Sequence, residues 1–155
     1  MANEDRKGRA ERGEAIDEGF AVLRADVAGI DVGSEKHWVC APARTGRGRE
    51  VAVFTATTPG VEQLAAWLKD RGVTSVALES TGVYWIVPHE MLEAHSFDVV
   101  LVDTRWLGRV PGRKKTDRRD CEWIQRLHSC GLLRGRFARS SRSACCGRSS
   151  ATKGR

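Results

Sequence analysis

The order of the apolar segments constrains the fold of this chain most strongly. Three short runs that are typical of β-strands follow one another, with few residues between them. Short connections predict an antiparallel meander, because parallel neighbours need a long crossover. Helical patterns then alternate with two further strand-like runs, which predicts parallel strands. The expected strands cover residues 27–33, 37–41, 50–56, 73–79 and 97–103, and the expected helices cover about residues 59–70, 83–94 and 117–130.

This order, βββαβαβα, predicts an α/β domain with a mixed five-stranded sheet of the RNase H-like type. The first helix has Thr58 as its expected N-cap and Pro59 at its first position. Apolar residues recur after Pro59 at helical spacing, and they should face the sheet. In a sheet of this type the first and fourth strands are neighbours near the centre.

Both of these strands carry a carboxylate that the apolar pattern does not explain. Asp31 lies within the apolar run 27–33, and Glu79 ends the run 73–79. A buried carboxylate is costly unless it has a partner, a metal ion or an opening to solvent. We therefore expect Asp31 and Glu79 to lie close together and to share a function.

The last expected helix begins with two more carboxylates, Asp117 and Asp120, on one helical face. Thr116 is its expected N-cap. Most acid pairs at this spacing are solvated helix faces, so the pair is weak evidence alone. Together with Asp31 and Glu79 it predicts a site that holds a hard divalent cation, Mg²⁺ or Mn²⁺, against a phosphate.

Positive charge gathers around the acidic pair. Residues 105–155 carry fifteen Lys and Arg against three acids, whereas residues 1–104 carry eleven against seventeen. This asymmetry fits a nucleic-acid partner, although a disordered basic tail accounts for part of it. The bases expected to hold the phosphate backbone are Arg113, Lys114, Lys115, Arg118 and Arg119.

Other candidate residues have an ordinary alternative interpretation. Tyr84, Trp85 and Trp106 are either platforms for splayed bases or ordinary core and surface residues. A zinc site from His128, Cys130, Cys145 and Cys146 matches no structural zinc spacing, and the five cysteines are expected to be reduced thiols. His37, His89, His95 and His128 are expected to be surface or hydrogen-bonded residues, since none has a defensible triad partner.

Composition sets the expected boundaries and the compartment. Residues 1–26 read as a charged, flexible leader, residues 27–133 as one folded domain, and residues 134–155 as a disordered Arg/Ser/Gly-rich tail. No run of 18 apolar residues occurs, so no membrane helix is expected. The N-terminus has no apolar signal core, which predicts a cytoplasmic protein.

Three segments resemble one known family. They are Gly-Ile-Asp-Val-Gly-Ser at 29–34, Leu-Glu-Ser-Thr-Gly-Val-Tyr-Trp at 78–85, and Lys-Thr-Asp-Arg-Arg-Asp-Cys at 115–121. Together, and in this order, they resemble the DEDD transposases of bacterial insertion sequences, the IS110 family, and the related Piv-type DNA invertases. The resemblance covers roughly residues 27–133.

The resemblance implies a RuvC-like domain in which Asp31, Glu79, Asp117 and Asp120 match the metal-binding tetrad. It implies metal-dependent DNA cleavage and strand transfer in transposition, with DNA as a partner. A structured guide RNA, used by some members, and a homo-oligomer stay open as further partners.

The chain departs from the family pattern in two places. Cys121 stands where alanine is usual, and the C-terminal domain with its strand-exchange serine is not recognisable. The tail from about Ala138 reads like out-of-frame translation. We therefore expect a truncated or frameshifted product that does not complete transposition alone.

Two alternatives to an active transposase domain remain. The first is a remnant that binds nucleic acid without completing strand transfer. The second is an actin-like or sugar-kinase-like ATPase fragment, because residues 29–34 also resemble the first phosphate loop of those proteins. Such ATPases need a second, duplicated domain, for which this chain has little room.

Overall fold

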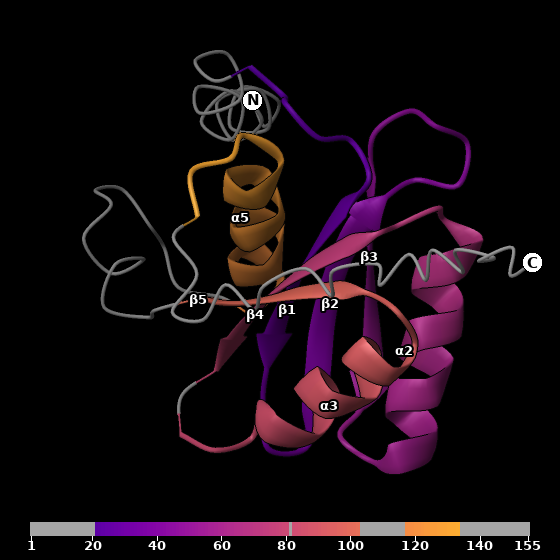
Figure 1. Ribbon diagram of the computed structural model, residues 1–155, viewed down its shortest axis with the longest axis vertical. Coiled ribbons are helices and arrows are strands. Elements are labelled where there is room, and N and C mark those ends of the chain that lie inside the picture. The colour runs from indigo at the N-terminus through magenta and orange to yellow at the C-terminus, as the bar shows by residue number, and fades with distance from the viewer. Residues whose placement is uncertain (1–20, 81, 103–116, 134–155) are drawn as a thin grey trace, which may run out of the picture.

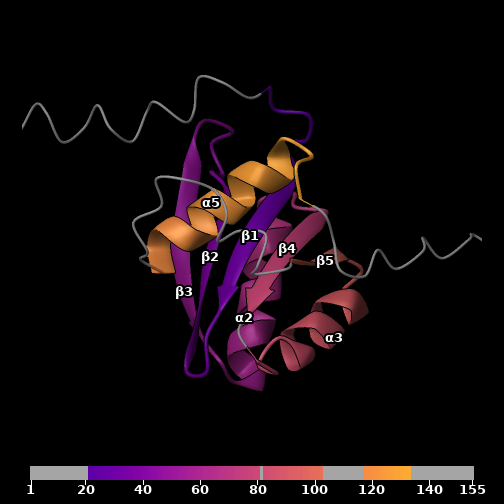
Figure 2. The same cartoon turned by 90° about the vertical axis from the view of Figure 1, so that its left-hand side faces the viewer.

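The computed structural model describes residues 21–80, 82–102 and 117–133. In these residues one five-stranded sheet is covered by α2 and α3 on one face and by α5 on the other (Figures 1 and 2). The elements are β1 Val27–Val32, β2 Lys36–Pro42, β3 Arg49–Thr55, α2 Thr58–Asp70, β4 Ser75–Ser80, α3 Ile86–Ala94, β5 Asp98–Val102 and α5 Asp117–Ser129.

The strand order is β3-β2-β1-β4-β5, with β1 at the centre. Strand β1 pairs antiparallel with β2, and β2 pairs antiparallel with β3. On its other side β1 pairs parallel with β4, which pairs parallel with β5. The predicted meander, the parallel strands and the mixed RNase H-like sheet are therefore confirmed.

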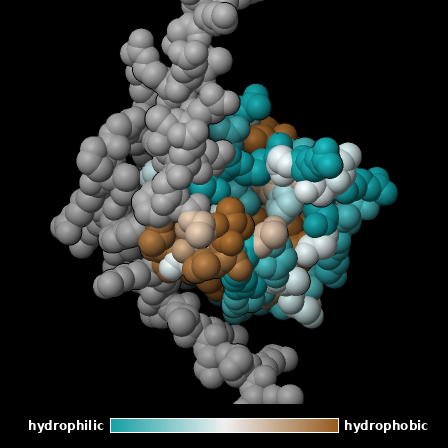
Figure 3. Space-filling view, turned by 90° about the horizontal axis from the view of Figure 1, so that it is seen from above, coloured by the Kyte–Doolittle hydropathy of each residue, from teal (hydrophilic) through white to brown (hydrophobic). Residues whose placement is uncertain are grey.

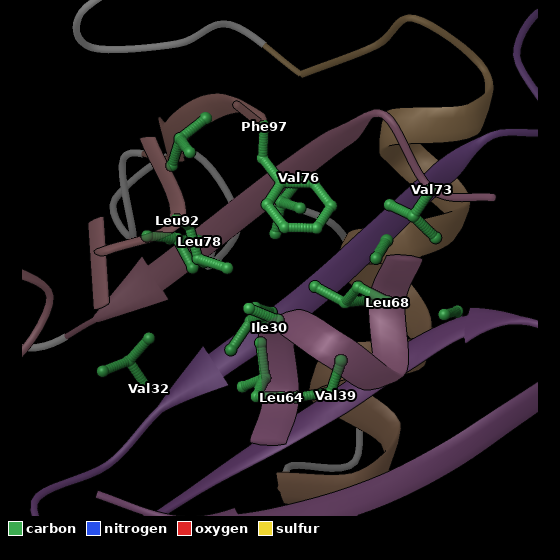
Figure 4. Packing of buried hydrophobic residues seen from close by; sticks show 14 of the residues in the cluster. Ile30, Val32, Val39, Leu64, Leu68, Val73, Val76, Leu78, Leu92 and Phe97 are labelled. Carbon is green, nitrogen blue, oxygen red and sulfur yellow. The ribbon is translucent and has the colours of Figure 1, made fainter. Parts of the chain in front are cut away.

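The larger hydrophobic core lies between the sheet and the layer of α2 and α3. Alternate residues of a strand point to opposite faces, so Ile30 and Leu78, both fully buried, point toward this layer. Leu64 and Leu68 of α2 pack against them (Figure 4). A smaller cluster on the other face joins Ala77 and Val102 of the sheet to α5, through Ile124 and Leu127.

Three predicted element starts were wrong by a few residues. The N-cap of α2 is Thr57, because its side-chain oxygen accepts a hydrogen bond from the backbone N–H of Gly60 at 3.3 Å and Thr58 is already helical. Strand β4 begins at Ser75, because the backbone N–H of Val73 still closes the end of α2 by donating to Leu68 O. Helix α3 begins at Ile86, after a turn at residues 82–85.

Pro88 is accommodated inside α3 without a break. It is the third helical residue, where a backbone N–H has no partner within the helix in any case. Its side chain is buried.

Several sequence-based expectations lie outside the described residues. They concern most of the leader, the connection that contains Trp106 and Thr116, and the tail from residue 134. Among the described helices, none has the length and apolarity needed to cross a membrane.

Candidate active site

Two of the four predicted acids meet at the centre of the sheet. Asp31 of β1 and Glu79 of β4 are register partners on adjacent parallel strands. Because Ile30 and Leu78 point into the core with α2 and α3, Asp31 and Glu79 point to the opposite face, where α5 lies. Both are partly exposed near the carboxyl ends of their strands. One strand pairing thus brings together two acids that lie 48 residues apart in the sequence.

Helix α5 crosses this face with its first turn toward the acids. Its C-terminal half lies over the beginning of the strands, because His128 Nε2 lies 2.8 Å from Ser75 Oγ and Gln125 Nε2 donates to Val27 O at 3.3 Å. The helix therefore runs opposite to β1 and β4, which is also visible in Figure 2. Its N-terminal turn lies at the carboxyl ends of these strands.

The close contact at Gly29 fixes the position of α5 along β1. A Cβ atom at Gly29 would lie 2.3 Å from Gln125 N and 2.6 Å from Cys121 O. Asp31 follows Gly29 by two residues, about 6.6 Å along the strand. The same distance along a helix is about four residues, which leads from the contact at 121–125 to the first turn of α5.

That first turn carries Asp117 and Asp120. Asp120 is buried, with 3% of its surface exposed. Asp117 is the first residue of α5, and its side chain lies outside the described residues. The tertiary structure thus brings Asp31, Glu79 and Asp120 to one edge of the sheet, together with the backbone position of Asp117.

Two buried thiols lie between the acids and the centre of α5. Cys40 pairs in register with Gly29, directly under the position of α5. Burial raises the pKa of the Cys40 thiol to about 12. Burial also raises the pKa of Cys121 far above its ordinary value, and the charges of Cys40, Glu122 and Asp31 add to the shift. The Asp31 carboxylate therefore acts electrostatically on the residue next to Asp120, and both thiols stay protonated near neutral pH.

The donor set fits a hard cation in its chemistry. Asp31, Glu79 and Asp120 offer carboxylate oxygens, the ligands that Mg²⁺ and Mn²⁺ prefer. Across residues 21–80, 82–102 and 117–133, however, no three His, Cys, Asp or Glu side chains form a group able to hold a metal ion. Clustered carboxylates repel one another without a cation, so they separate unless one is bound. A complete site in this structure therefore depends on Asp117 or on a small approach of the three described acids.

The zinc alternative has no support among the described residues. His128 Nε2 is engaged with Ser75 Oγ inside the α5 interface, and Cys130 is buried. Cys145 and Cys146 lie outside the described residues. Burial lowers the pKa of His128 to about 4, so this histidine is a neutral, hydrogen-bonded interface residue, as expected.

Of the predicted bases and aromatic residues, the structure describes Arg118, Arg119, Tyr84 and Trp85. Arg118 and Arg119 are exposed on the first turn of α5, and Arg118 Nε donates to Glu122 Oε1 at 3.3 Å. Tyr84 is exposed, whereas Trp85 packs against the core and lies edge-on to His89. A stacking platform at Trp85 is therefore disfavoured. Arg113, Lys114, Lys115 and Trp106 lie outside the described residues.

Sequence reasoning missed Gly29 and Lys36. A glycine inside a strand is a known signal of a close backbone approach, and it lies two residues before Asp31. Lys36 begins β2 next to the end of β1, and its Nζ lies 5.8 Å from the ring centroid of Trp38, the register partner of Asp31. Only the β1–β2 register places this cation beside the register partner of Asp31.

A family model for DEDD transposases of the IS110 type, described as "Transposase", matches residues 28–143. The chain belongs to this transposase family. The match favours a transposase over the ATPase fragment considered above, and it covers all four predicted acids of the transposase domain. No curated protein matches the sequence. Among solved structures, the transposase is similar to RuvC of Thermus thermophilus, with a TM-score of 0.37 and 14% identity over 70% of this chain and 98% of RuvC.

Proposed function

We propose that this transposase domain cleaves phosphodiester bonds of DNA and transfers the strands, with Mg²⁺ or Mn²⁺ held by Asp31, Glu79, Asp117 and Asp120. The register pairing of Asp31 with Glu79, under the first turn of α5, is the observation that supports this most directly. Each of these acids comes from an element whose position is set by packing elsewhere, so the site is supported on rigid structure.

The proposed roles follow from the chemistry of the side chains. The four carboxylates bind the cation, and Arg118 and Arg119 hold backbone phosphates on the exposed side of α5. When bound in such a site, a divalent cation polarises phosphoryl oxygens and lowers the pKa of water. Burial of Asp120 limits the access of bulk water to one side of the acids.

The test is a titration of Mg²⁺ and of Mn²⁺ by calorimetry, on the full chain and on Asp31→Asn and Asp120→Asn. We expect each variant to bind the cation at least about tenfold more weakly, since each loses one charged ligand. The control is Glu90→Gln, which removes an exposed acid on α3. Circular dichroism checks that each variant is folded. Unchanged titrations in both aspartate variants would contradict the metal site.

A second candidate function is nucleic-acid binding without chemistry. One observation favours it, namely that the described side chains alone form no three-ligand group. It predicts that the chain retains DNA or RNA binding but neither binds Mg²⁺ nor nicks branched DNA in its presence. Mg²⁺-dependent nicking that is lost in Asp31→Asn would rule this candidate out.

A further inference from the structure

One buried hydrogen-bond donor next to the acids has no acceptor. The indole Nε1 of Trp38, on β2, is buried and makes no hydrogen bond in the part of the chain that the structure describes. A buried indole N–H usually has a partner, because burial removes its hydrogen bonds to water without replacing them. The missing acceptor of Trp38 therefore needs a physical explanation.

The register of the sheet places Trp38 beside Asp31. The two residues are partners across the β1–β2 pair, so their side chains share one face, with Cβ atoms about 4.5–5.5 Å apart. The other neighbours of Trp38 on this face of the sheet are Val53 on β3, and Lys36 and Cys40 on β2 itself. Valine and a charged lysine accept no hydrogen bond, and a thiol is a weak acceptor. Of these four neighbours, only Asp31 can accept a strong hydrogen bond.

The ring of Trp38 is held in place from the side of Lys36. The Lys36 Nζ lies 5.8 Å from the ring centroid, within the range of a cation–π interaction. The Trp38 side chain is also half-buried, and it has only two rotatable bonds. The donor is therefore kept beside Asp31 whether or not a cation is bound.

An exposed apolar surface does not explain the place of Trp38. The large apolar residues that the domain exposes lie mostly elsewhere. Val22 and Leu23 are exposed where the segment before β1 meets the end of α5, and Figure 3 looks onto this end, where hydrophobic residues gather in one part of the visible surface. Val83 and Val87 are exposed around the start of α3. Trp38, by contrast, has its polar atom buried on the face that carries the acids.

We infer that Trp38 is a positioning residue of the metal site, whose indole N–H holds the Asp31 carboxylate in the orientation that binds the cation. This role rests on the proposed function. Among the described side chains no three acids form a group able to hold a metal ion, so the carboxylates have to turn toward one another to bind one. Carboxylates that bind a metal ion are in turn held by hydrogen bonds from other residues. The unpaired donor and the separated acids thus have one explanation.

The first test is a titration of Mg²⁺ by calorimetry, on the full chain and on Trp38→Phe and Trp67→Phe. Phenylalanine keeps an aromatic ring but has no N–H group. Trp67 lies on α2 and packs against the core on the other face of the sheet, so Trp67→Phe is the matched control. Loss of a residue that orients a metal ligand weakens metal binding by about 10–100-fold. We expect at least a tenfold loss, within that approximate range, in Trp38→Phe and no change in Trp67→Phe.

The second test separates a hydrogen bond from a merely structural role. The indole N–H groups of the wild-type chain are labelled with ¹⁵N and followed by NMR while Mg²⁺ is added. The Trp38 signal is assigned through its contacts with Lys36 and Val53. Donation to a carboxylate moves an N–H proton signal downfield, so we expect this shift for Trp38 and not for Trp67. Because the wild-type chain is used, the signal decides the matter even if Trp38→Phe folds poorly.

Each outcome decides the inference. Weaker Mg²⁺ binding in Trp38→Phe, together with the downfield shift of the Trp38 signal, supports it. Unchanged affinity in Trp38→Phe overturns it, and so does a weaker affinity without a shift, since Trp38 would then act through packing alone. In both of these cases the proposed function still stands if Asp31→Asn loses the cation. Failure of the proposed function is distinct, because the wild-type chain would then bind neither Mg²⁺ nor Mn²⁺, and both proposals would be overturned.

Discussion

At the scale of the residue, Gly29 decides whether the acids meet. It has no side chain, and the backbone of α5 fills the space where a Cβ would be. The close approach places the first turn of α5 beside Asp31. A glycine in the central strand costs backbone entropy, but here it permits the contact between helix and sheet.

Gly29→Ala should therefore destabilise the protein and displace α5. The added Cβ would lie 2.3 Å from Gln125 N, and backbone cannot yield as the end of a flexible side chain can. We expect a loss of about 3 kcal/mol in the free energy of unfolding, measured by urea denaturation. The control is Gly46→Ala, which meets nothing within 4 Å and should cost about 1 kcal/mol through its positive φ alone. Equal losses in the two variants would contradict the close approach.

The residue scale also explains why the acidic residues stood out in the sequence. Asp31 interrupts an apolar run, and physical chemistry requires a reason for such an interruption. The thiols gave no comparable signal. Cys40 and Cys121 read as ordinary apolar positions, and only the structure places Cys40 opposite Gly29 and the Cys121 thiol within the electrostatic reach of Asp31.

At the scale of the element, α5 joins the two ends of the domain. Its first turn carries Asp117 and Asp120, and its last turn holds the segment before β1, because Ser129 O accepts hydrogen bonds from the backbone N–H groups of Leu23 and Arg24. Its apolar positions were readable from helical spacing, and Ile124 and Leu127 do pack on the sheet. The direction in which α5 crosses the sheet could not be predicted from the sequence. Helical periodicity shows which side of a helix is apolar, but not which way the helix runs.

The end of α5 should make the stability of the protein depend on pH. His128 is buried against Ser75, and burial lowers its pKa from 6.5 to about 4. Above pH 6.5 the imidazole is neutral in both states and contributes no pH dependence. Between pH 6.5 and 4 the unfolded chain takes up a proton that the folded chain does not, so the free energy of unfolding falls as the pH falls, by up to roughly 3 kcal/mol.

The measurement is urea denaturation at a series of pH values between 7.5 and 4, for the wild type and for His128→Gln. The variant cannot take up this proton, so we expect its stability curve to be flatter in this window. Its stability at pH 7.5 serves as the control, since it reports the loss of packing and hydrogen bonding alone. Parallel curves for the two proteins would show that another group causes the pH dependence.

At the scale of the whole molecule, β1 is the strand on which both layers depend. It pairs with β2 and β4, faces the main core with Ile30, and supports α5 with Gly29. The proposed metal site is therefore attached to the strand on which both layers depend. Damage to β1 should affect the entire domain in one step.

Ile30→Ala should lower the free energy of unfolding by about 2–5 kcal/mol, because it leaves a cavity in a fully buried position. We expect a single cooperative transition by circular dichroism and by tryptophan fluorescence. The control is Val53→Ala on the edge strand β3, where the side chain is 44% exposed and the loss should be about 1 kcal/mol or less. Two separate transitions in Ile30→Ala would mean that the layers fold independently.

The sequence by itself determined the order of the elements and the mixed sheet, and it singled out the candidate acids. These follow from local properties, because strand and helix periods, turn residues and a charge in an apolar run are all read over a few neighbours. The first residues of the elements were harder to predict from the sequence. Thr57 and Thr58 are chemically equivalent as N-caps, and only the backbone geometry shows that Thr57 is the cap.

Only the tertiary structure decided which of these residues come together. The register of β1 with β4 pairs Asp31 with Glu79, and the antiparallel course of α5 brings Asp120 to the same edge. The contact of His128 with Ser75 likewise joins two residues that no sequence spacing connects. Pairing register and helix orientation are set by packing between distant segments, and local sequence patterns do not encode them.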